Sequence, residues 1–163
     1  MKTLILMRHT KSDWSTGATS DHARPLNKRG TASAAALGDW LRARGWLPDE
    51  VLCSTATRTR ETLAGLRLDA SVRYLDELYH ADPDTMLAAL HDATGDTVLM
   101  LGHNPGIAEC AGLLVRAPPA DDRFHSYPTG ATLVARFPVD NWSAVTWGSG
   151  EVADFIVPRD LTD

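Results

Sequence analysis

Four short apolar runs alternate with longer amphipathic segments, and this alternation constrains the fold more than any other feature of the chain. The runs cover residues 3–7, 50–53, 72–75 and 97–101, and polar residues bound each of them. Apolar runs of this length are typical of strands buried inside a sheet. Strands that alternate with helices form largely parallel sheets with crossover helices. We therefore predict an α/β fold, a three-layer α/β/α arrangement around a largely parallel central sheet.

The segments between the runs carry signals for the start and end of helices. Asn27 is a residue type that favours helix N-caps, and Gly45 is typical of the position just after a helix end. Asp82-Pro83 predicts another helix start, with an N-cap residue followed by proline at the first helical position. Asn104-Pro105 predicts the same arrangement ahead of a helix over residues 107–115.

The last third of the chain is predicted to contain a surface loop and a terminal hairpin. The loop covers residues 116–128, which include three prolines and several charges. The hairpin strands are predicted at 131–137 and 144–148. The chain length favours a single domain over residues 1–163.

The composition argues against several functional classes. The 16 basic and 21 acidic residues are interspersed, without the basic block that would follow a nucleic-acid backbone, so no nucleic-acid partner is expected. The apolar runs fall far below the ~20 residues that span a bilayer, so no membrane association and a cytoplasmic location are expected. Cys53 and Cys110 are too few for a disulfide scaffold and are expected to be buried thiols.

Three of the predicted strands are followed by side chains that are typical of anion sites. Arg8 and His9 follow the first strand, Arg58 follows the second, and His103 follows the fourth. Ligands bind at the carboxyl ends of parallel strands, where helix N-termini add partial positive charge. These four residues are therefore predicted to form a phosphate pocket.

A cysteine phosphatase is an alternative, because that class uses a Cys, five intervening residues and an Arg as its phosphate loop. The spacing after Cys53 does not fit. Thr59 stands at the required position, with Arg58 one residue too early and Arg60 one too late. Cys53 is therefore not predicted to be a nucleophile.

The ordered motifs of the chain resemble the histidine phosphatase superfamily, with its phosphoglycerate mutase-like fold, and within it the short SixA-like phosphohistidine phosphatases. The motifs are Leu6–His9, Lys11–Trp14, Arg24–Leu26 with Gly30, Ser54–Arg58 with Thr62, Leu75–Tyr79, Gly102–Pro105, Pro128–Ala131 and Trp142. One residue departs from the pattern, since Thr10 stands where relatives commonly have glycine or alanine. Its β-branched side chain is expected either to narrow the pocket or to add a hydroxyl ligand.

The resemblance implies a phosphatase that needs neither a metal nor a cofactor. His9 would attack phosphorus and become transiently phosphorylated, and water would then release inorganic phosphate. The charges of Arg8 and Arg58 disfavour an imidazolium and so keep a nucleophilic ring neutral. With His103, and with Asn104 through its amide or side chain, they would bind the transferring phosphoryl group.

The roles of two residues stay open. Glu77 lies where superfamily members that act on phosphate esters often hold a general acid, and it is otherwise a solvated loop carboxylate. An alkoxide leaving group needs a proton more than the imidazole of phosphohistidine does. Arg24 either borders the pocket or has a structural role.

The shortness of the chain bears on the substrate. Little of the sequence is available for a lid, which favours an open pocket and phosphorylated proteins as partners. The preferred hypothesis is dephosphorylation of phosphohistidine on proteins. A phosphomonoesterase that acts on a small phosphorylated substrate stays an alternative, as does a catalytically silent module that binds phosphorylated partners.

Overall fold

The computed structural model describes residues 1–15 and 17–162, whose strands form one sheet in the order β3-β2-β4-β1-β5-β6. The strands are β1 (Lys2–Arg8), β2 (Glu50–Ser54), β3 (Ser71–Leu75), β4 (Thr97–Gly102), β5 (Thr132–Phe137) and β6 (Glu151–Ile156). The pairs β2–β3, β2–β4 and β1–β4 are parallel, whereas β5 pairs antiparallel with both β1 and β6. The prediction of a largely parallel sheet is confirmed.

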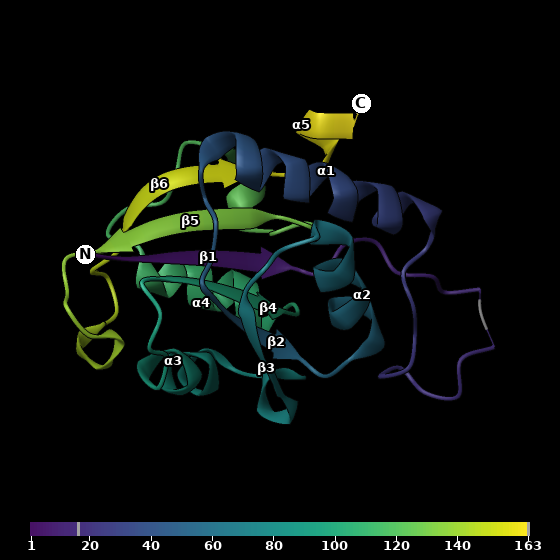
Figure 1. The fold of residues 1–163 in the computed structure, drawn as a ribbon, viewed down its shortest axis with the longest axis horizontal. Helices are drawn as coiled ribbons and strands as arrows, with labels where there is room; N and C mark the ends of the chain where they lie inside the picture. Colours follow the sequence, from purple (N-terminus) through teal and green to yellow (C-terminus); the bar gives the residue numbers. More distant parts are fainter. Residues whose placement is uncertain (16, 163) are drawn as a thin grey trace.

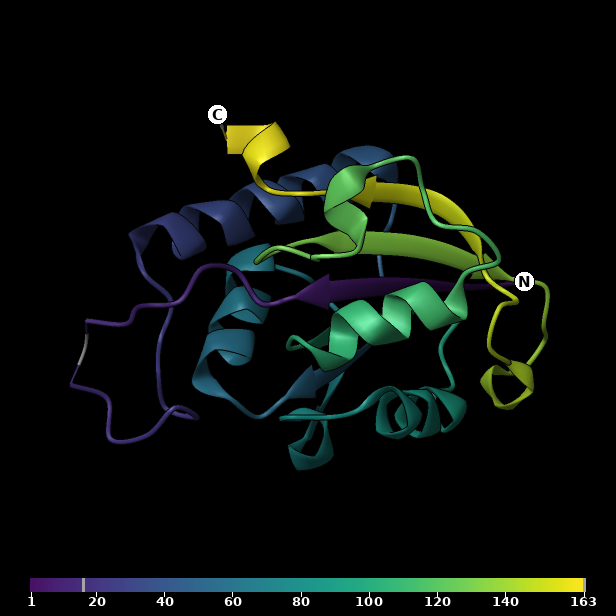
Figure 2. The same ribbon diagram turned by 180° about the vertical axis from the view of Figure 1, so that it is seen from behind.

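Helices cover both faces of this sheet (Figures 1 and 2). The helices are α1 (Lys28–Arg44), α2 (Thr57–Leu66), α3 (Pro83–His91), α4 (Gly106–Leu114) and α5 (Arg159–Thr162), and the short 3-10 turns are η1 (Asp76–Leu78), η2 (Asp122–Phe124) and η3 (Trp142–Ala144). The pair α1 and α2 packs on one face and the pair α3 and α4 on the other. The predicted three layers are therefore present. Among the described residues, no helix has the length and apolar character that crossing a bilayer requires.

Strand β1 shows why the first apolar run is continuous. Leu4 and Leu6 are fully buried in the core under α3 and α4, and Ile5 and Met7 are fully buried in the core under α1 and α2. A central strand covered on both faces has no solvent-facing side, so every position favours an apolar residue.

The structure confirms the predicted starts of α1 and α3 but not the predicted cap of α4. The Asp82 carboxylate accepts a hydrogen bond from the amide of Thr85 at 2.8 Å, and Pro83 opens α3 as predicted. The helix predicted after Asn104-Pro105 is present as α4, but the predicted cap is wrong, because Pro105 is the N-cap residue and no side chain caps this helix. The Asn104 amide instead donates to the carbonyls of Ser126 and Tyr127, at 3.0 and 3.1 Å. The first predicted helix agrees with α1 at both ends, where the side chain of Asn27 accepts from Gly30 and Gly45 adopts the left-handed conformation.

The terminal hairpin is present, but its second strand was placed too early. The chain makes the turn η3 at 142–144, where the Trp142 indole donates to the carbonyl of Gly95 at 2.6 Å, and β6 follows at 151–156. Strand β6 lies at the edge of the sheet and is only half-buried. Its sequence, Glu-Val-Ala-Asp-Phe-Ile, is therefore a weaker apolar signal than that of residues 144–148.

The segment 116–128 is not only a surface loop. Phe124 and Tyr127 are buried in the core on the α3 and α4 face. The Tyr127 hydroxyl donates to the carbonyl of Leu6 and accepts from the amide of Leu133, so it joins β1 to β5. Aromatic side chains bury enough area to fix a loop that is otherwise rich in proline and charge.

Candidate active site

The carboxyl ends of β1, β2 and β4 meet at one edge of the sheet because these strands are parallel neighbours. Arg8 ends β1 in register with Gly102 at the end of β4, so His9 and His103 follow side by side. Arg58 lies in the first turn of α2, shortly after β2. The four residues predicted to form a phosphate pocket line one cavity of about 230 Å³. The other residues that line it are Lys11, Ser12, Trp14, Arg24, Asn104 and Thr129.

His9 is held with one ring nitrogen available for nucleophilic attack. Its Nδ1 atom lies 2.7 Å from the carbonyl oxygen of Thr10, and only an N–H can bond to that oxygen. The proton therefore sits on Nδ1, and Nε2 keeps its lone pair. Burial first, and then the charges of Arg8, Arg58 and Arg24, lower the pKa of His9 to about 3, although the hydrogen bond to the Thr10 carbonyl acts in the opposite direction. The ring is neutral at ordinary pH.

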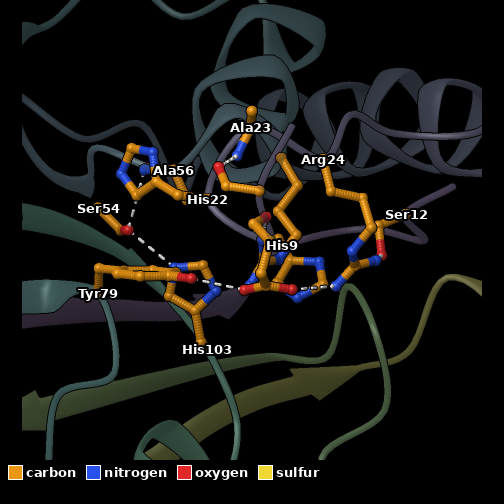
Figure 3. A network of polar contacts seen from close by, with 12 residues as sticks. His9, Ser12, His22, Ala23, Arg24, Ser54, Ala56, Tyr79 and His103 are labelled. Carbon is orange, nitrogen blue, oxygen red and sulfur yellow. Dashed lines mark hydrogen bonds and ion pairs between the residues drawn. The ribbon is translucent and has the colours of Figure 1, made fainter. Parts of the chain in front are cut away.

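His103 is held in the opposite tautomer. Its Nε2 atom lies 2.7 Å from the hydroxyl of Ser54 (Figure 3). That hydroxyl oxygen also accepts from the amide of Ala56 at 3.3 Å, and among the described residues the acceptor recorded for its own hydrogen is Nε2 of His103. We therefore assign the fully buried Ser54 hydroxyl as the donor of this pair, because a buried O–H needs an acceptor. Nδ1 of His103 therefore carries the proton. Burial, and then the neighbouring His9 and Arg58, lower the pKa of His103 to about 3. The two ring centres are 5.4 Å apart, so this N–H donor lies beside the nucleophile.

The guanidinium groups around the cavity are fixed by backbone and carboxylate oxygens. Arg8 donates to the carbonyl of Tyr127 at 3.1 Å. Arg58 donates to the carbonyl of Asp21 at 2.8 Å and to its carboxylate at 3.1 Å. Arg24 donates to the same carboxylate at 3.2 Å and to the Ser12 hydroxyl. Asp21 therefore holds two arginines in place at once.

Several buried polar atoms in this region have no partner among the described residues. They are Nε of Arg8, Nε of Arg24, Nε of Arg58, Nδ1 of His103 and Oδ1 of Asn104. All five belong to residues that line the cavity. An unpaired buried donor costs about 1–3 kcal/mol, so four such donors around one cavity are typical of a site built for an anion. The donor set, three guanidinium groups and one imidazole N–H, suits a phosphoryl group.

Comparison with known proteins agrees with this geometry. The family model of the histidine phosphatase superfamily (branch 1) matches residues 4–86, which is half of the chain. An uncharacterized protein of Mycobacterium tuberculosis is 39% identical over 161 residues, which cover 94% of this chain and 100% of the relative. The chain belongs to the histidine phosphatase superfamily.

Solved structures show the same fold over nearly the whole chain. A candidate phosphohistidine phosphatase SixA from Nakamurella multipartitia has a TM-score of 0.86 and 36% identity, with 96% of each chain covered. A second candidate SixA, from Agrobacterium tumefaciens, has a TM-score of 0.78 and 26% identity, with 96% of this chain and 98% of that chain covered. The predicted phosphoglycerate mutase-like fold of the superfamily is confirmed.

Sequence reasoning missed two residues of this superfamily site and left a third open. No sequence pattern indicates Asp21, and Tyr79 is indicated only as the end of the motif Leu75–Tyr79. The Tyr79 hydroxyl donates to the Asp21 carboxylate at 2.6 Å. That bond, and then the hydrogen bond from Arg24 and the charge of Arg58, hold the pKa of Asp21 well below its usual range. Arg24 lines the cavity and is buried, so it belongs to the site. A loop has no periodicity, and nothing in its sequence marks Asp21 as a partner of Arg58.

Asn104 belongs to the cavity wall in a different way from the one expected. Because its side-chain amide donates to two loop carbonyls, the atom left unpaired is the acceptor Oδ1. The hydrogens of the side-chain amide are thus already used, and a contact between Asn104 and a phosphoryl group stays a prediction. Its observed contacts instead hold the loop whose Tyr127 carbonyl accepts from Arg8.

Glu77 and Thr10 are not brought to His9. Glu77 is exposed in η1 and lines a separate cavity with Arg73 and Thr85. The Thr10 hydroxyl lies 3.3 Å from that of Thr62, and Thr10 does not line the cavity of this superfamily site. Neither expectation for Thr10, a narrower pocket or a hydroxyl ligand, agrees with this placement.

Cys53 has no role in the cavity. Burial raises the pKa of this thiol to about 12, and its sulfur donates to the carbonyl of Ser54. Cys110 is also a buried free thiol with its pKa raised by burial to about 12. Both agree with the prediction of buried thiols, and a protonated Cys53 cannot serve as a nucleophile.

Proposed function

We propose that the protein is a phosphatase that removes the phosphoryl group from phosphohistidine on proteins, through a phosphorylated His9. The observation that carries this proposal is the cavity itself. A neutral imidazole with a free Nε2 faces a group of unpaired buried donors. A nucleophile surrounded by donors for phosphoryl oxygens is the arrangement that phosphoryl transfer requires.

In the first step, Nε2 of His9 attacks phosphorus opposite the leaving group. The bond from phosphorus to the substrate nitrogen breaks, and the substrate ring leaves as neutral imidazole with its proton on the other ring nitrogen. Charge spreads over the equatorial oxygens, where the guanidinium groups of Arg8, Arg24 and Arg58 stabilise it. The Thr10 carbonyl stabilises the positive charge that His9 gains, because it accepts from Nδ1–H.

In the second step, water attacks the phosphorylated ring. The bond between phosphorus and Nε2 breaks, the water oxygen becomes part of inorganic phosphate, and both water protons leave with that product. His9 returns to its neutral form with Nδ1–H on the Thr10 carbonyl. His103 stays neutral and donates its Nδ1–H to a phosphoryl oxygen throughout.

The lining of the cavity supports a P–N substrate over a phosphate ester. No aspartate or glutamate is among the described residues that line it, and Glu77 lies elsewhere. An ester releases an alkoxide, which needs an acid to protonate it, whereas a phosphohistidine releases an imidazole. The similarity to two candidate SixA phosphohistidine phosphatases supports the same substrate. The two free thiols fit the predicted cytoplasmic location.

The test compares three substrates with the purified protein. We expect hydrolysis of a histidine-phosphorylated carrier protein and of phosphoramidate, the simplest P–N compound, and slow hydrolysis of glycerol phosphate, an alkyl ester whose alkoxide leaving group needs an acid. His9→Ala should abolish turnover and the acid-labile phosphate trapped on the wild-type protein. His125→Ala is the matched control, because His125 is an exposed histidine outside the cavity.

Each alternative function has its own result in this assay. Rapid turnover of small phosphate esters with the carrier protein left intact would favour the phosphomonoesterase. Tight binding of the phosphorylated carrier protein without release of phosphate would favour the silent binding module. Undiminished turnover by His9→Ala would refute the mechanism.

A further inference from the structure

The active-site cavity shares lining residues with two other cavities, which share none of the described residues with each other. One neighbour, of about 330 Å³, shares Lys11 and Thr129 with it, and we name this the basic cleft. The other, of about 240 Å³, shares His103 and Asn104 with it, and we name this the acidic cleft. The candidate site is therefore the middle of three adjoining cavities.

The basic cleft carries cations that are available to a ligand. Lys11, Arg29, Arg123 and Arg159 line it, and no aspartate or glutamate is among its described lining residues. Arg123 is already paired with Asp121 and Asp160, at 2.7 and 2.8 Å. The side chains of Lys11 and Arg29 are exposed and have no ion pair or hydrogen bond within the described part of the chain. These two charges can bind an anion without first breaking an internal contact.

The acidic cleft carries the opposite charge. Asp82 and Glu109 line it together with His80. The Asp82 carboxylate is engaged with the amide of Thr85, whereas the exposed side chain of Glu109 has no recorded partner among the described residues. The sign of the surface charge therefore reverses across the phosphate cavity.

We propose that the three cavities form one trough for a polypeptide substrate, with a fixed charge polarity on the two sides of the phosphorylated residue. Acidic residues on one side bind in the basic cleft beside Arg29, and the other side, which is neutral or basic, lies beside Glu109. The trough rests on the proposed function, because it positions the phosphorylated residue next to His9. Opposite charges across a binding surface select partners, and like charges reject them.

The occupant is a polypeptide rather than a small compound with two anionic groups. A small bisphosphate would use the central cavity and the basic cleft and leave the acidic cleft empty. A chain that runs through the site extends beyond the phosphorylated residue in both directions. Only a polypeptide can therefore contact the basic cleft and the acidic cleft at the same time while its phosphorylated residue lies in the central cavity.

The test uses three peptides with one central phosphohistidine. One has two aspartates on the amino-terminal side and two asparagines on the other, the second has the reverse order, and the third has asparagine throughout. We expect the wild-type protein to hydrolyse one of the two aspartate peptides with a kcat/KM about fivefold above that of the asparagine peptide. The other aspartate peptide should have a kcat/KM no higher than that of the asparagine peptide. Which of the two is favoured gives the direction of the bound chain.

Charge-reversal variants locate the effect. Arg29→Glu should abolish the preference for the favoured peptide and leave phosphoramidate turnover unchanged. Lys28→Glu is the matched control, since it makes the same charge change in the same first turn of α1 but Lys28 does not line the cleft. Lys28→Glu should keep the preference. Glu109→Lys should raise kcat/KM for the disfavoured aspartate peptide.

The outcomes separate the trough from the activity. Hydrolysis of all three peptides at equal rates, or equal effects of Arg29→Glu and Lys28→Glu, would overturn the trough and leave the phosphatase standing. A small bisphosphate hydrolysed faster than every peptide would also overturn it. No hydrolysis of any P–N compound would overturn the proposed function, and the trough with it.

Discussion

The two buried histidines make stability depend on pH in a direction that the structure defines. His9 and His103 are 5% and 6% exposed, and burial lowers the pKa of each from 6.5 to about 3. Below pH 6.5, the two imidazoles are therefore protonated in the unfolded chain, whereas in the folded protein they stay neutral down to about pH 3. Folding stability is thus fully present above pH 6.5 and is lost as the pH falls.

The size of this loss follows from the two shifted pKa values. Between pH 6.5 and pH 5, each ring contributes a loss of about 2 kcal/mol, at about 1.4 kcal/mol per pH unit. Together the two rings contribute about 4 kcal/mol, which is a large part of the 5–15 kcal/mol of a typical domain (about 10 on average). Asp21 has its lowered pKa in a more acidic range, so it does not contribute in this interval.

Urea denaturation at pH 7 and pH 5 in phosphate-free buffer measures this loss. We compare the wild-type protein with the double variant His9→Asn/His103→Asn, whose amides do not titrate. The loss of unfolding free energy between the two pH values should be about 4 kcal/mol smaller in the double variant. The difference between proteins cancels the contribution of the other histidines. Equal losses in both proteins would show that the two rings are not held neutral by burial, and the reasoning would be refuted.

Three further predictions concern single side chains. Ser54→Ala should remove the hydrogen bond that fixes the tautomer of His103, so that the ¹⁵N chemical shifts of its ring move towards a mixture of both tautomers and kcat/KM on phosphoramidate falls about tenfold. Ser54→Thr should keep the wild-type chemical shifts and the wild-type kcat/KM. Unchanged shifts in Ser54→Ala would show that Ser54 does not set the tautomer. Glu77→Gln should leave turnover of phosphoramidate within about twofold of wild type, because a group outside the cavity gives no general-acid contribution; a loss of about a hundredfold would place Glu77 in the reaction. Tyr127→Phe should lower the free energy of unfolding by about 1–3 kcal/mol in chemical denaturation, because the hydroxyl joins β1 to β5 in a dry core; a change near zero would show that this bond contributes little.

The sequence predicts the central strands of the sheet well and its edge strand and loops poorly. Residues 4–7 and 98–101 are buried on both faces, so their apolar runs are local signals of central strands. The edge strand β6 has no such signal, because none of its side chains is fully buried, and the prediction for its position is wrong. The proline-rich segment 116–128 was misinterpreted for a related reason, since its buried residues are two isolated aromatics.

Some residues of the candidate site could also be predicted from the sequence, and others could not. The convergence of Arg8, His9, Arg58 and His103 was predictable, because each follows a strand end and parallel strands place those ends together. The contribution of Asp21 was not, because it depends on a loop residue that contacts Arg58 from 37 positions away.

The sequence by itself determined the layered α/β architecture and which residue types reach the catalytic edge of the sheet. These depend on the order of residues relative to strand ends, which is local information. Only the tertiary structure decided which atoms of these side chains are left without a partner: the Nε2 of His9, the Nδ1–H of His103 and the Oδ1 of Asn104. His9 and His103 are each held by one hydrogen-bond partner at 2.7 Å, and Asn104 is held by two, at 3.0 and 3.1 Å. The partners of His103 and Asn104 come from other parts of the chain. Such partners are defined only when the chain has folded.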